Sequence, residues 1–246
     1  MDENKYALIT GATSGIGKAA AIQLAEKGYS LLIVARSEDK FKDLRNEIKR
    51  NSLIDQQDIQ LIRCDLSSLK SIKKASEQIN ELDFPISLLI NNAGSYYWER
   101  TLTEDGFEAT FAVCYLSHFL LTNLVLGKLI HASEARIINL ASNIHKFFGI
   151  DWNNLMSEKK YQSQKVYSNA KTAIVLFTHA LSRRLKTTNI RVHSVHPGHV
   201  KTNMTTGKAS GINKLFMNLI PGYISTNQAA SYIVNAATNP QYSSQT

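Results

Sequence analysis

The sequence predicts an α/β protein built on a doubly wound, parallel sheet in a single domain. Short apolar runs alternate along the chain with longer stretches whose hydrophobic residues recur at helical spacing. Most of these runs are continuously apolar, as expected for strands that helices cover on both faces. No linker rich in Pro, Gly or Ser and no internal repeat divides the sequence, so residues 1–246 are interpreted as one domain.

The elements are expected in a regular strand–helix order. The strands are expected at Tyr6–Ile9, Leu31–Ala35, Ile59–Ile62, Leu88–Ile90, Ile137–Leu140 and Val192–Val195. The helices are expected to include residues 41–48, 69–79, 104–129, 160–186 and 225–237. Ser67 or Ser68 is a suitable N-cap for the helix at 69–79, and Thr103 for the next one. Residues 201–223 show no clean period and are expected to form a flexible loop over the substrate.

The composition is that of an ordinary folded protein, with 43% hydrophobic and 20% charged residues. The formal charge of +8 comes from Lys and Arg residues scattered over helical patterns, which favours solvated helix faces over a nucleic-acid site. Cys64 and Cys114 lack the spacing of zinc ligands, so no metal site is expected, and they indicate a reducing, cytoplasmic location. The polar segment Met1–Lys5 resembles neither a signal peptide nor a membrane span.

A glycine-rich turn follows the first expected strand and precedes an Ala-rich helix. It reads Thr10-Gly11-Ala12-Thr13-Ser14-Gly15-Ile16-Gly17. Free backbone N–H groups and the positive end of the helix dipole favour phosphate at a helix N-terminus, and glycines let the backbone approach a pyrophosphate closely. In this context the turn predicts a Rossmann-type dinucleotide site rather than a purely structural turn. The residues expected to hold the cofactor are Gly11, Thr13, Ser14, Gly15, Ile16 and Gly17.

The spacing Gly-x-x-x-Gly-x-Gly resembles the loop of the short-chain dehydrogenase/reductase family. The other motifs of that family follow in its usual order: Asn91-Asn92-Ala93-Gly94, Ser142, Tyr167-x-x-x-Lys171 and His196-Pro197-Gly198-x-Val200-x-Thr202. The resemblance implies an oxidoreductase that transfers a hydride between a nicotinamide cofactor and a carbonyl or alcohol. It also assigns cofactor contacts to Asn92, Ala93, Gly94, Tyr167, Lys171, Pro197, Gly198, Val200 and Thr202.

The end of the second expected strand decides between two dinucleotides. An acidic residue there binds the ribose hydroxyls of NAD and repels the 2′-phosphate of NADP. Here Ala35 occupies the acidic position and Arg36 and Ser37 follow, so a bidentate guanidinium contact with the phosphate predicts NADP(H) over NAD(H). The alternative is that Arg36 merely begins a surface helix. By resemblance, Asp65 and Leu66 lie at the adenine.

Tyr167 and Lys171 lie four residues apart, so a helix places both side chains on one face. The ammonium is expected to lower the pKa of the phenol from about 10 toward working pH, where general acid/base catalysis is efficient. By resemblance, Ser142 hydrogen-bonds the substrate oxygen, Tyr167 transfers the proton, and Lys171 also holds the nicotinamide ribose.

One position departs from the family pattern. Cys114 stands where the family normally has Asn, which holds a water in the proton path to the lysine, and Ser117 stands where Gly is usual. Cysteine is a weak donor and acceptor, so a slower enzyme or a different water path is expected. The alternative function is an impaired family member that binds NADP(H) as a sensor or scaffold. The retained Ser142, Tyr167 and Lys171 argue against this alternative.

The segment between Ser142 and Tyr167 is long and resembles the retinol dehydrogenase and protochlorophyllide reductase branch. Three sets of apolar residues are expected around the substrate cleft: Phe147, Phe148, Trp152 and Tyr161, then Tyr96, Tyr97 and Trp98, then Leu215, Phe216 and Met217. They predict a bulky apolar substrate of retinoid, steroid, isoprenoid or aromatic type, although any one of them fits a core position equally well. Resemblance also implies a homodimer that pairs through helices at 107–129 and 167–185.

Overall fold

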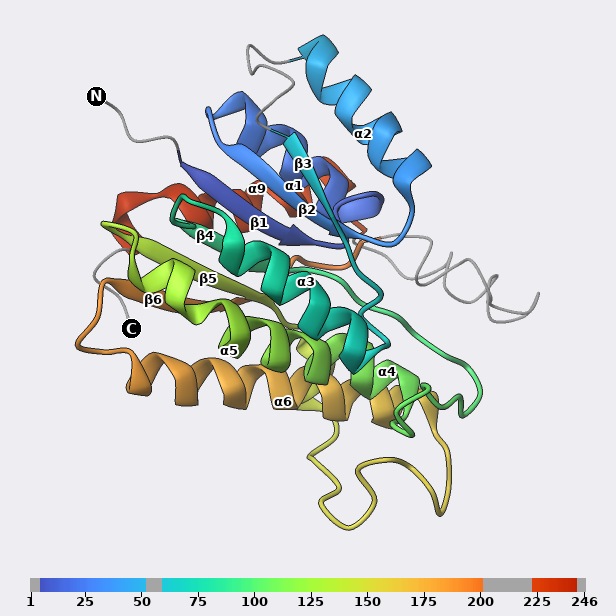
Figure 1. Ribbon diagram of the computed structural model, residues 1–246. Coiled ribbons are helices and arrows are strands. Elements are labelled where there is room, and N and C mark those ends of the chain that lie inside the picture. Colours follow the sequence, from blue (N-terminus) through green and yellow to red (C-terminus); the bar gives the residue numbers. More distant parts are fainter. Residues whose placement is uncertain (1–4, 52–58, 201–222, 243–246) are drawn as a thin grey trace.

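The computed structural model describes residues 5–51, 59–200 and 223–242 (Figure 1). Its centre is a six-stranded sheet with the order β3-β2-β1-β4-β5-β6, in which every pairing is parallel. The strands are β1 (Tyr6–Thr10), β2 (Ser30–Ala35), β3 (Ile59–Arg63), β4 (Leu88–Asn91), β5 (Ala135–Leu140) and β6 (Ile190–Val195). The strand order reverses between β1 and β4, which is where open α/β sheets bind ligands. The predicted doubly wound, parallel sheet is therefore confirmed.

Helices cover both faces of this sheet. The longer ones are α1 (Gly15–Glu26), α2 (Glu38–Asn51), α3 (Leu69–Glu81), α5 (Ser117–Ile130), α6 (Ser163–Arg184) and α9 (Thr226–Thr238). Helices α1, α2 and α9 pack on one face, and α3, α5 and α6 pack on the other (Figure 1). Each face of the sheet therefore has its own hydrophobic core, and successive residues of β1 point into different cores. Ile9 packs in the core with α1, α2 and α9, and Leu8 packs in the core with α3, α5 and α6. This arrangement explains why the strands read as continuous apolar runs.

Serine hydroxyl groups cap the N-termini of two of the helices. The Ser68 hydroxyl accepts a hydrogen bond from the backbone N–H of Ser71 at 3.2 Å at the start of α3. The Ser225 hydroxyl accepts one from the N–H of Gln228 at 3.1 Å at the start of α9. Each bond satisfies a donor that the first turn of a helix leaves free. Of the two serines considered as N-cap of α3, the structure uses Ser68.

The helix expected at 104–129 begins later than predicted. Its first turn is α4 (Ala109–Phe111), capped by the buried Glu108 carboxylate, which accepts from the N–H groups of Thr110 (3.0 Å) and Phe111 (2.7 Å). The preceding residues form a turn in which Gly106 has a φ of +81°, a conformation that ends a helix. Thr103 is therefore not the N-cap. A short π-helix, η2 (Ala112–Leu116), then leads into α5.

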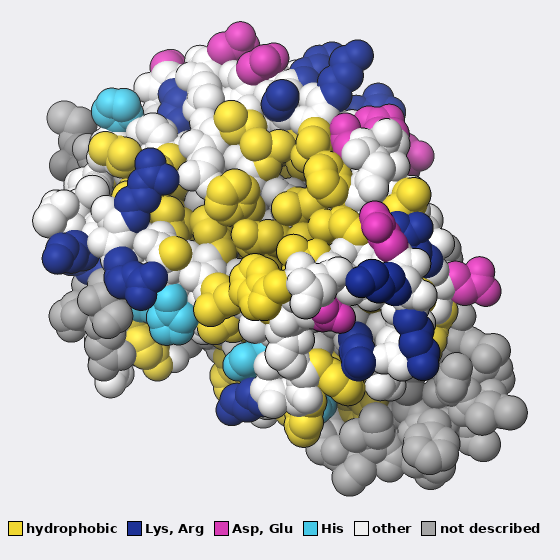
Figure 2. All heavy atoms as spheres, turned by 90° about the horizontal axis from the view of Figure 1, so that it is seen from below, with side chains coloured by type: hydrophobic (Ala, Val, Ile, Leu, Met, Phe, Trp, Pro, Cys, Tyr) yellow, Lys and Arg dark blue, Asp and Glu magenta, His cyan; other side chains and the backbone are white. Residues whose placement is uncertain are grey.

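The stretch Ala109–Ile130 is long and apolar enough to cross a bilayer by length and composition alone. More than half of it is buried inside the domain, as is usual for a core helix. The outer surfaces of α5 and α6 nevertheless carry exposed hydrophobic residues, among them Phe119, Leu124 and Leu176. In the view from below Figure 1, hydrophobic side chains occupy the middle of the face, and Lys and Arg side chains lie toward its edges (Figure 2).

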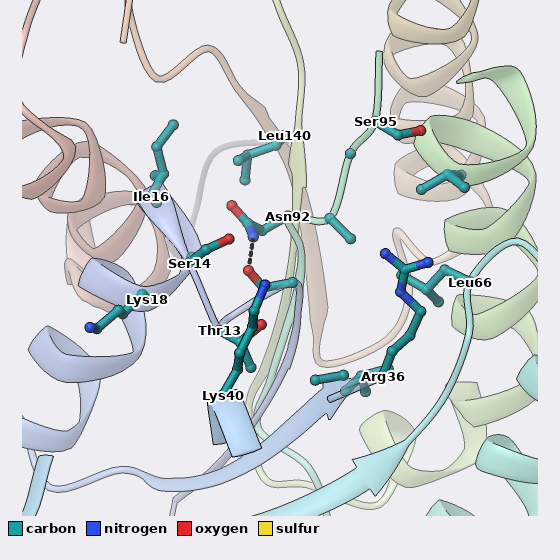
Figure 3. Close-up of a pocket in the computed structure, with 18 of the residues that line it drawn as sticks. Thr13, Ser14, Ile16, Lys18, Arg36, Lys40, Leu66, Asn92, Ser95 and Leu140 are labelled. Carbon is teal, nitrogen blue, oxygen red and sulfur yellow. Dashed lines mark hydrogen bonds between the residues drawn. The ribbon is translucent and has the colours of Figure 1, made fainter. Parts of the chain in front are cut away.

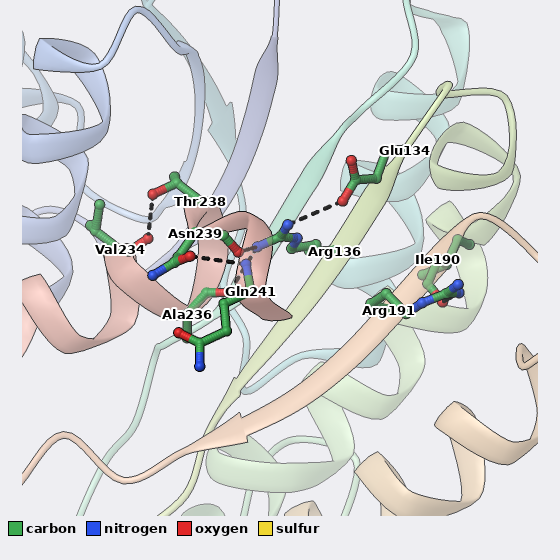
Figure 4. Close-up of polar contacts among 9 residues, drawn as sticks. All are labelled: Glu134, Arg136, Ile190, Arg191, Val234, Ala236, Thr238, Asn239 and Gln241. Carbon is green, nitrogen blue, oxygen red and sulfur yellow. Dashed lines mark hydrogen bonds and ion pairs between the residues drawn. The ribbon is translucent and has the colours of Figure 1, made fainter. Parts of the chain in front are cut away.

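A buried arginine joins the end of α9 to the sheet (Figure 4). Arg136 at the start of β5 donates to the carbonyl oxygens of Ala236 (3.3 Å) and Asn239 (2.8 Å), and its guanidinium lies 3.1 Å from the carboxylate of Glu134. Carbonyl groups at a helix C-terminus carry a partial negative charge, so they stabilise this cation. The contact fixes α9 beside α1, which carries the glycine-rich turn at its N-terminus.

Candidate active site

A cavity of about 720 Å³ opens at the carboxyl ends of β1, β2 and β4, where the strand order reverses (Figure 3). Most residues predicted to hold the cofactor line it: Gly11, Thr13, Ser14, Gly15, Ile16, Gly17, Arg36, Ser37, Asp65, Leu66, Asn92, Ala93, Gly94, Tyr167, Lys171 and Pro197. Within the described part of the chain, Ser142, Gly198 and Val200 are not part of its lining. Thr202 and the apolar set Leu215, Phe216 and Met217 lie outside the described residues, as does the expected loop at 201–223 except for its last residue.

The glycine-rich turn is held against the loop after β4. The side-chain amide of Asn92 donates to the carbonyl oxygens of Thr10 (2.8 Å) and Gly11 (3.2 Å). A Cβ at Gly17 would lie only 2.5 Å from the Gly11 carbonyl oxygen and would also clash with the Asn92 amide. Gly11 itself has a φ of +68°. The close packing therefore requires glycine at both positions, and it leaves the N-terminus of α1 facing the cavity.

The side chains of Thr10 and His118 stabilise this turn. The sequence pattern did not indicate this structural role for either residue. The Thr10 hydroxyl accepts from the N–H groups of Asn92 and Ala93, both at 3.0 Å, and lies 3.1 Å from Nε2 of His118. His118 is buried, and desolvation together with the positive charge of Lys171 lowers its pKa from 6.5 to about 3. The only indication of this role in the sequence was that His118 is a polar residue among the apolar positions of the expected helix.

The depressed pKa of His118 predicts acid-sensitive stability. The unfolded chain binds a proton at His118 below pH 6.5, whereas the folded protein does not until about pH 3. This contribution to the free energy of unfolding is complete above pH 6.5 and is lost as the pH falls from there toward 3. Urea unfolding at pH 7.5 and pH 5 is expected to show the loss, and the neutral variant His118→Asn to show a smaller one. An equal loss in both proteins would contradict the assignment.

Basic and acidic side chains meet at the end of β2. The guanidinium of Arg36 lies 3.8 Å from the carboxylate of Asp65, and both are solvent-accessible. Burial raises the pKa of Asp65, but hydrogen bonds from Ser67 and the charge of Arg36 outweigh it and leave the pKa below its usual value. Lys40 also lines the cavity, one turn beyond Arg36 at the start of α2. Its spacing of four from Arg36 was a signal that sequence analysis passed over.

Tyr167 and Lys171 both come from α6 and both reach the cavity wall. The Lys171 ammonium donates to the carbonyl oxygen of Leu140 at 2.7 Å and lies 5.6 Å from the centre of the Tyr167 ring. Burial raises the pKa of Tyr167, and the Ser142 hydrogen bond lowers it only in part. The expected depression of this pKa by Lys171 is therefore wrong for this structure, because desolvation of the phenol is the larger effect.

Cys114 is fully buried in η2 and pairs with the loop after β4. Its Sγ lies 3.2 Å from the carbonyl oxygen of Ser95, to which it donates, and 3.4 Å from the N–H of Ser95, from which it accepts. Burial raises the pKa of the thiol, so it stays protonated. Cys114 therefore holds the Ser95 backbone at the cavity wall. The Ser117 hydroxyl donates to the carbonyl oxygen of Val113 at 2.8 Å, so its hydrogen bond is made within the helix.

An aromatic wall adjoins Tyr167. The ring of Tyr96 meets the ring of Tyr167 edge-on at 5.5 Å and the ring of Trp98 at 4.9 Å. The Tyr96 hydroxyl hydrogen-bonds Ser163 at 2.9 Å, and Tyr161 donates to the carbonyl oxygen of Tyr97 at 2.7 Å. The aromatic wall therefore consists of Tyr96, Tyr97, Trp98 and Tyr161. Phe147 and Trp152 were also expected around the cleft, but they are exposed to solvent and do not belong to this wall.

The profile of the short chain dehydrogenase family matches residues 5–213. The chain is 40% identical over 210 residues to retinol dehydrogenase 13 of Homo sapiens, an alignment that covers 85% of this chain and 62% of that protein. It is also 40% identical over 208 residues to retinol dehydrogenase 14 of Mus musculus, covering 81% and 62%. The chain thus spans less than two thirds of the length of these relatives.

A solved structure shares the fold. The short-chain dehydrogenase from Sphingobium yanoikuyae, determined in complex with NADPH, superposes with a TM-score of 0.75 at 21% identity, covering 94% of this chain and 83% of that one. This likeness shows that the two proteins share a fold. The chain belongs to the short-chain dehydrogenase family and resembles its retinol dehydrogenase branch.

Proposed function

We propose that the protein is an NADP(H)-dependent oxidoreductase that acts on a bulky apolar carbonyl or alcohol. One observation carries the proposal: a single cavity brings the glycine-rich turn and Arg36 together with Tyr167 and Lys171. The first pair fits a dinucleotide phosphate, and the second pair fits proton transfer at a reacting oxygen. When bound, the nicotinamide supplies or accepts the hydride.

The raised pKa of Tyr167 favours one direction of proton transfer. A buried phenol that keeps its proton at neutral pH is poised to donate it to the oxygen of a carbonyl as that oxygen gains negative charge. Ser142 lowers the pKa of the same phenol in part, and we assign it the role of holding the substrate oxygen. Lys171, fixed by the Leu140 carbonyl, supplies positive charge next to the phenolate that donation leaves behind. The proposed direction is therefore reduction of a carbonyl.

Arg36 is expected to select NADPH. A guanidinium at the end of β2 can bind the 2′-phosphate bidentately, and Lys40 adds charge to the same part of the cavity. Arg36→Ala is expected to raise KM for NADPH about tenfold, the effect of losing about 1.4 kcal/mol of binding, and to leave KM for NADH unchanged. The control is Lys42→Ala, because Lys42 pairs on the exposed face of α2 with Glu38. Tighter binding of NADH than of NADPH by the unmodified protein would contradict this assignment.

The substrate class follows from the aromatic wall. Tyr96 presents ring surface next to the reacting phenol, and Trp98 extends this surface by packing against Tyr96. Such surface binds flat or bulky apolar groups. The names of the human and mouse relatives place retinoids within this class. A panel of retinoid, steroid, isoprenoid and aromatic carbonyls, followed by consumption of NADPH, tests it. Preference for short hydrophilic aldehydes would exclude it.

The alternative function is binding of NADP(H) without turnover, and Cys114 at the usual Asn position is the observation in its favour. A thiol bound to the Ser95 backbone is a poor holder of water. Cys114→Asn is therefore expected to raise turnover severalfold if the water path limits the rate. Unchanged turnover would show that the proton reaches Lys171 without this position. Tight NADPH binding by a protein that turns over no carbonyl would favour the sensor.

We also expect a homodimer in the cytoplasm. The exposed residues Phe119, Leu124 and Leu176 give α5 and α6 an apolar outer surface, which fits pairing of the two helices with those of a second copy. Both cysteines are free and buried, as in proteins of a reducing compartment. Light scattering at micromolar concentration tests the dimer, and the mass of a single chain would reject it.

A further inference from the structure

Two side chains on one loop are far more exposed than hydrophobic residues usually are. Phe147 is 77% exposed and Trp152 is 70% exposed, whereas Leu102, the next among the described large hydrophobic residues, is 49% exposed. Both lie in the segment between β5 and α6, which projects from the body of the molecule (Figure 1). Exposed aromatic residues of this size mark an interaction site when they gather on one element.

The same segment is rich in lysine. Its exposed charged residues are Lys146, Asp151, Glu158, Lys159 and Lys160, and the exposed Lys165 follows in the first turn of α6. Lysines outnumber carboxylates, and Lys146 adjoins Phe147 directly. Aromatic side chains flanked by lysines are the composition that binds the interface of an anionic bilayer, where the ring enters the headgroup region and the ammonium groups meet lipid phosphates.

Hydrogen bonds hold the segment between β5 and α6 against the rest of the domain. Its backbone therefore keeps Phe147 and Trp152 at the surface. The Ser168 hydroxyl of α6 donates to the carbonyl oxygens of Ile144 (2.9 Å) and Phe148 (3.1 Å). Arg100 donates to the carbonyl oxygen of Met156 at 3.2 Å. Tyr161 closes the far end of the loop onto the backbone of Tyr97, within the aromatic wall. One end of this surface therefore adjoins the site of the proposed chemistry.

We propose that the segment 144–165 is a docking surface for an anionic lipid bilayer, with Phe147 and Trp152 inserted at the headgroup level. The proposal rests on the proposed function in one respect: a bulky apolar substrate is dissolved in membranes, and docking here brings the aromatic wall beside Tyr167 to the lipid surface. Net positive charge favours a bilayer over an apolar protein partner as the occupant.

Tryptophan fluorescence provides the test, because the chain contains only Trp98 and Trp152. In Trp98→Phe, Trp152 is the sole reporter. Vesicles of phosphatidylcholine with phosphatidylserine are expected to shift its emission to shorter wavelength, and brominated lipid is expected to quench it. Vesicles of phosphatidylcholine alone are expected to bind about tenfold more weakly. No shift with either lipid, or equal binding to both, would overturn the proposal.

Sedimentation of variants with the same vesicles shows which surface of the molecule binds them. Trp152→Ala is expected to lower vesicle affinity about tenfold, and Lys159→Glu with Lys160→Glu by a similar factor. Tyr232→Ala, a matched change at an exposed aromatic residue of α9, is expected to leave the affinity unchanged. Loss with Tyr232→Ala and none with Trp152→Ala would assign binding to another surface and overturn the proposal. Since vesicle binding is measured without cofactor or substrate, its failure is distinct from failure of the proposed activity.

Discussion

Turnover is expected to fall by about a thousandfold in Tyr167→Phe, within the range that general acid/base catalysis contributes. The substitution removes the hydroxyl whose pKa Ser142 lowers, and it keeps the ring that packs against Tyr96. NADPH affinity is expected to change little, because the turn that we propose to bind the phosphates leads into α1, whereas Tyr167 lies on α6. The measurement is single-turnover oxidation of NADPH with an apolar aldehyde.

The control for this prediction is Tyr161→Phe. Its hydroxyl is partly buried and donates to the Tyr97 backbone and not to the reacting oxygen, so a change in KM larger than the change in kcat is expected. Equal loss of kcat in both variants would mean that the aromatic wall as a whole, and not the Tyr167 proton, limits the reaction. Unchanged turnover in Tyr167→Phe would remove Tyr167 from the chemistry.

Gly17→Ala is expected to abolish cofactor binding and to destabilise the fold. The new methyl group would lie 2.5 Å from the Gly11 carbonyl oxygen, a backbone atom that cannot move without opening the turn. Overpacking of this kind costs about 1–3 kcal/mol, and displacement of the turn also misplaces the N–H groups that face phosphate.

The matched control is Gly127→Ala in the middle of α5, where a Cβ would meet nothing within 4 Å. Alanine is the better helix former there, so a gain of about 0.5–1 kcal/mol in stability is expected. Urea unfolding and NADPH titration measure both variants. Retained NADPH affinity in Gly17→Ala would contradict the assignment of the turn to the phosphates.

The sheet could be predicted because its signal is local. Six apolar runs, each long enough for one strand, fix the strands, and the glycine-rich turn fixes where the first helix begins. The residues of the cavity came from motifs at strand ends, because parallel strands bring those ends to one edge of the sheet. Sequence pattern therefore identified about half of the cavity lining without any contact information.

The parts that could not be predicted depend on contacts between distant segments. Glu108 became an N-cap because Gly106 turns the chain before it, although helical periodicity extends to residue 104. The 108-residue separation of Thr10 and His118 hides their pairing. The pKa of Tyr167 depends on burial, which the spacing to Lys171 does not report. The exposure of Trp152 likewise follows from the position of the whole loop.

Transfer of deuterium tests the central claim most directly. The protein is incubated with an apolar aldehyde and NADPH that carries deuterium at C4 of the nicotinamide, on one face or on the other, and the alcohol formed is analysed by mass spectrometry. The account predicts deuterium on the carbinol carbon from one of the two labelled cofactors, and formation of this product about a thousandfold more slowly by Tyr167→Phe. Product without label from either cofactor, or tight NADPH binding with no product from any apolar carbonyl, would contradict it.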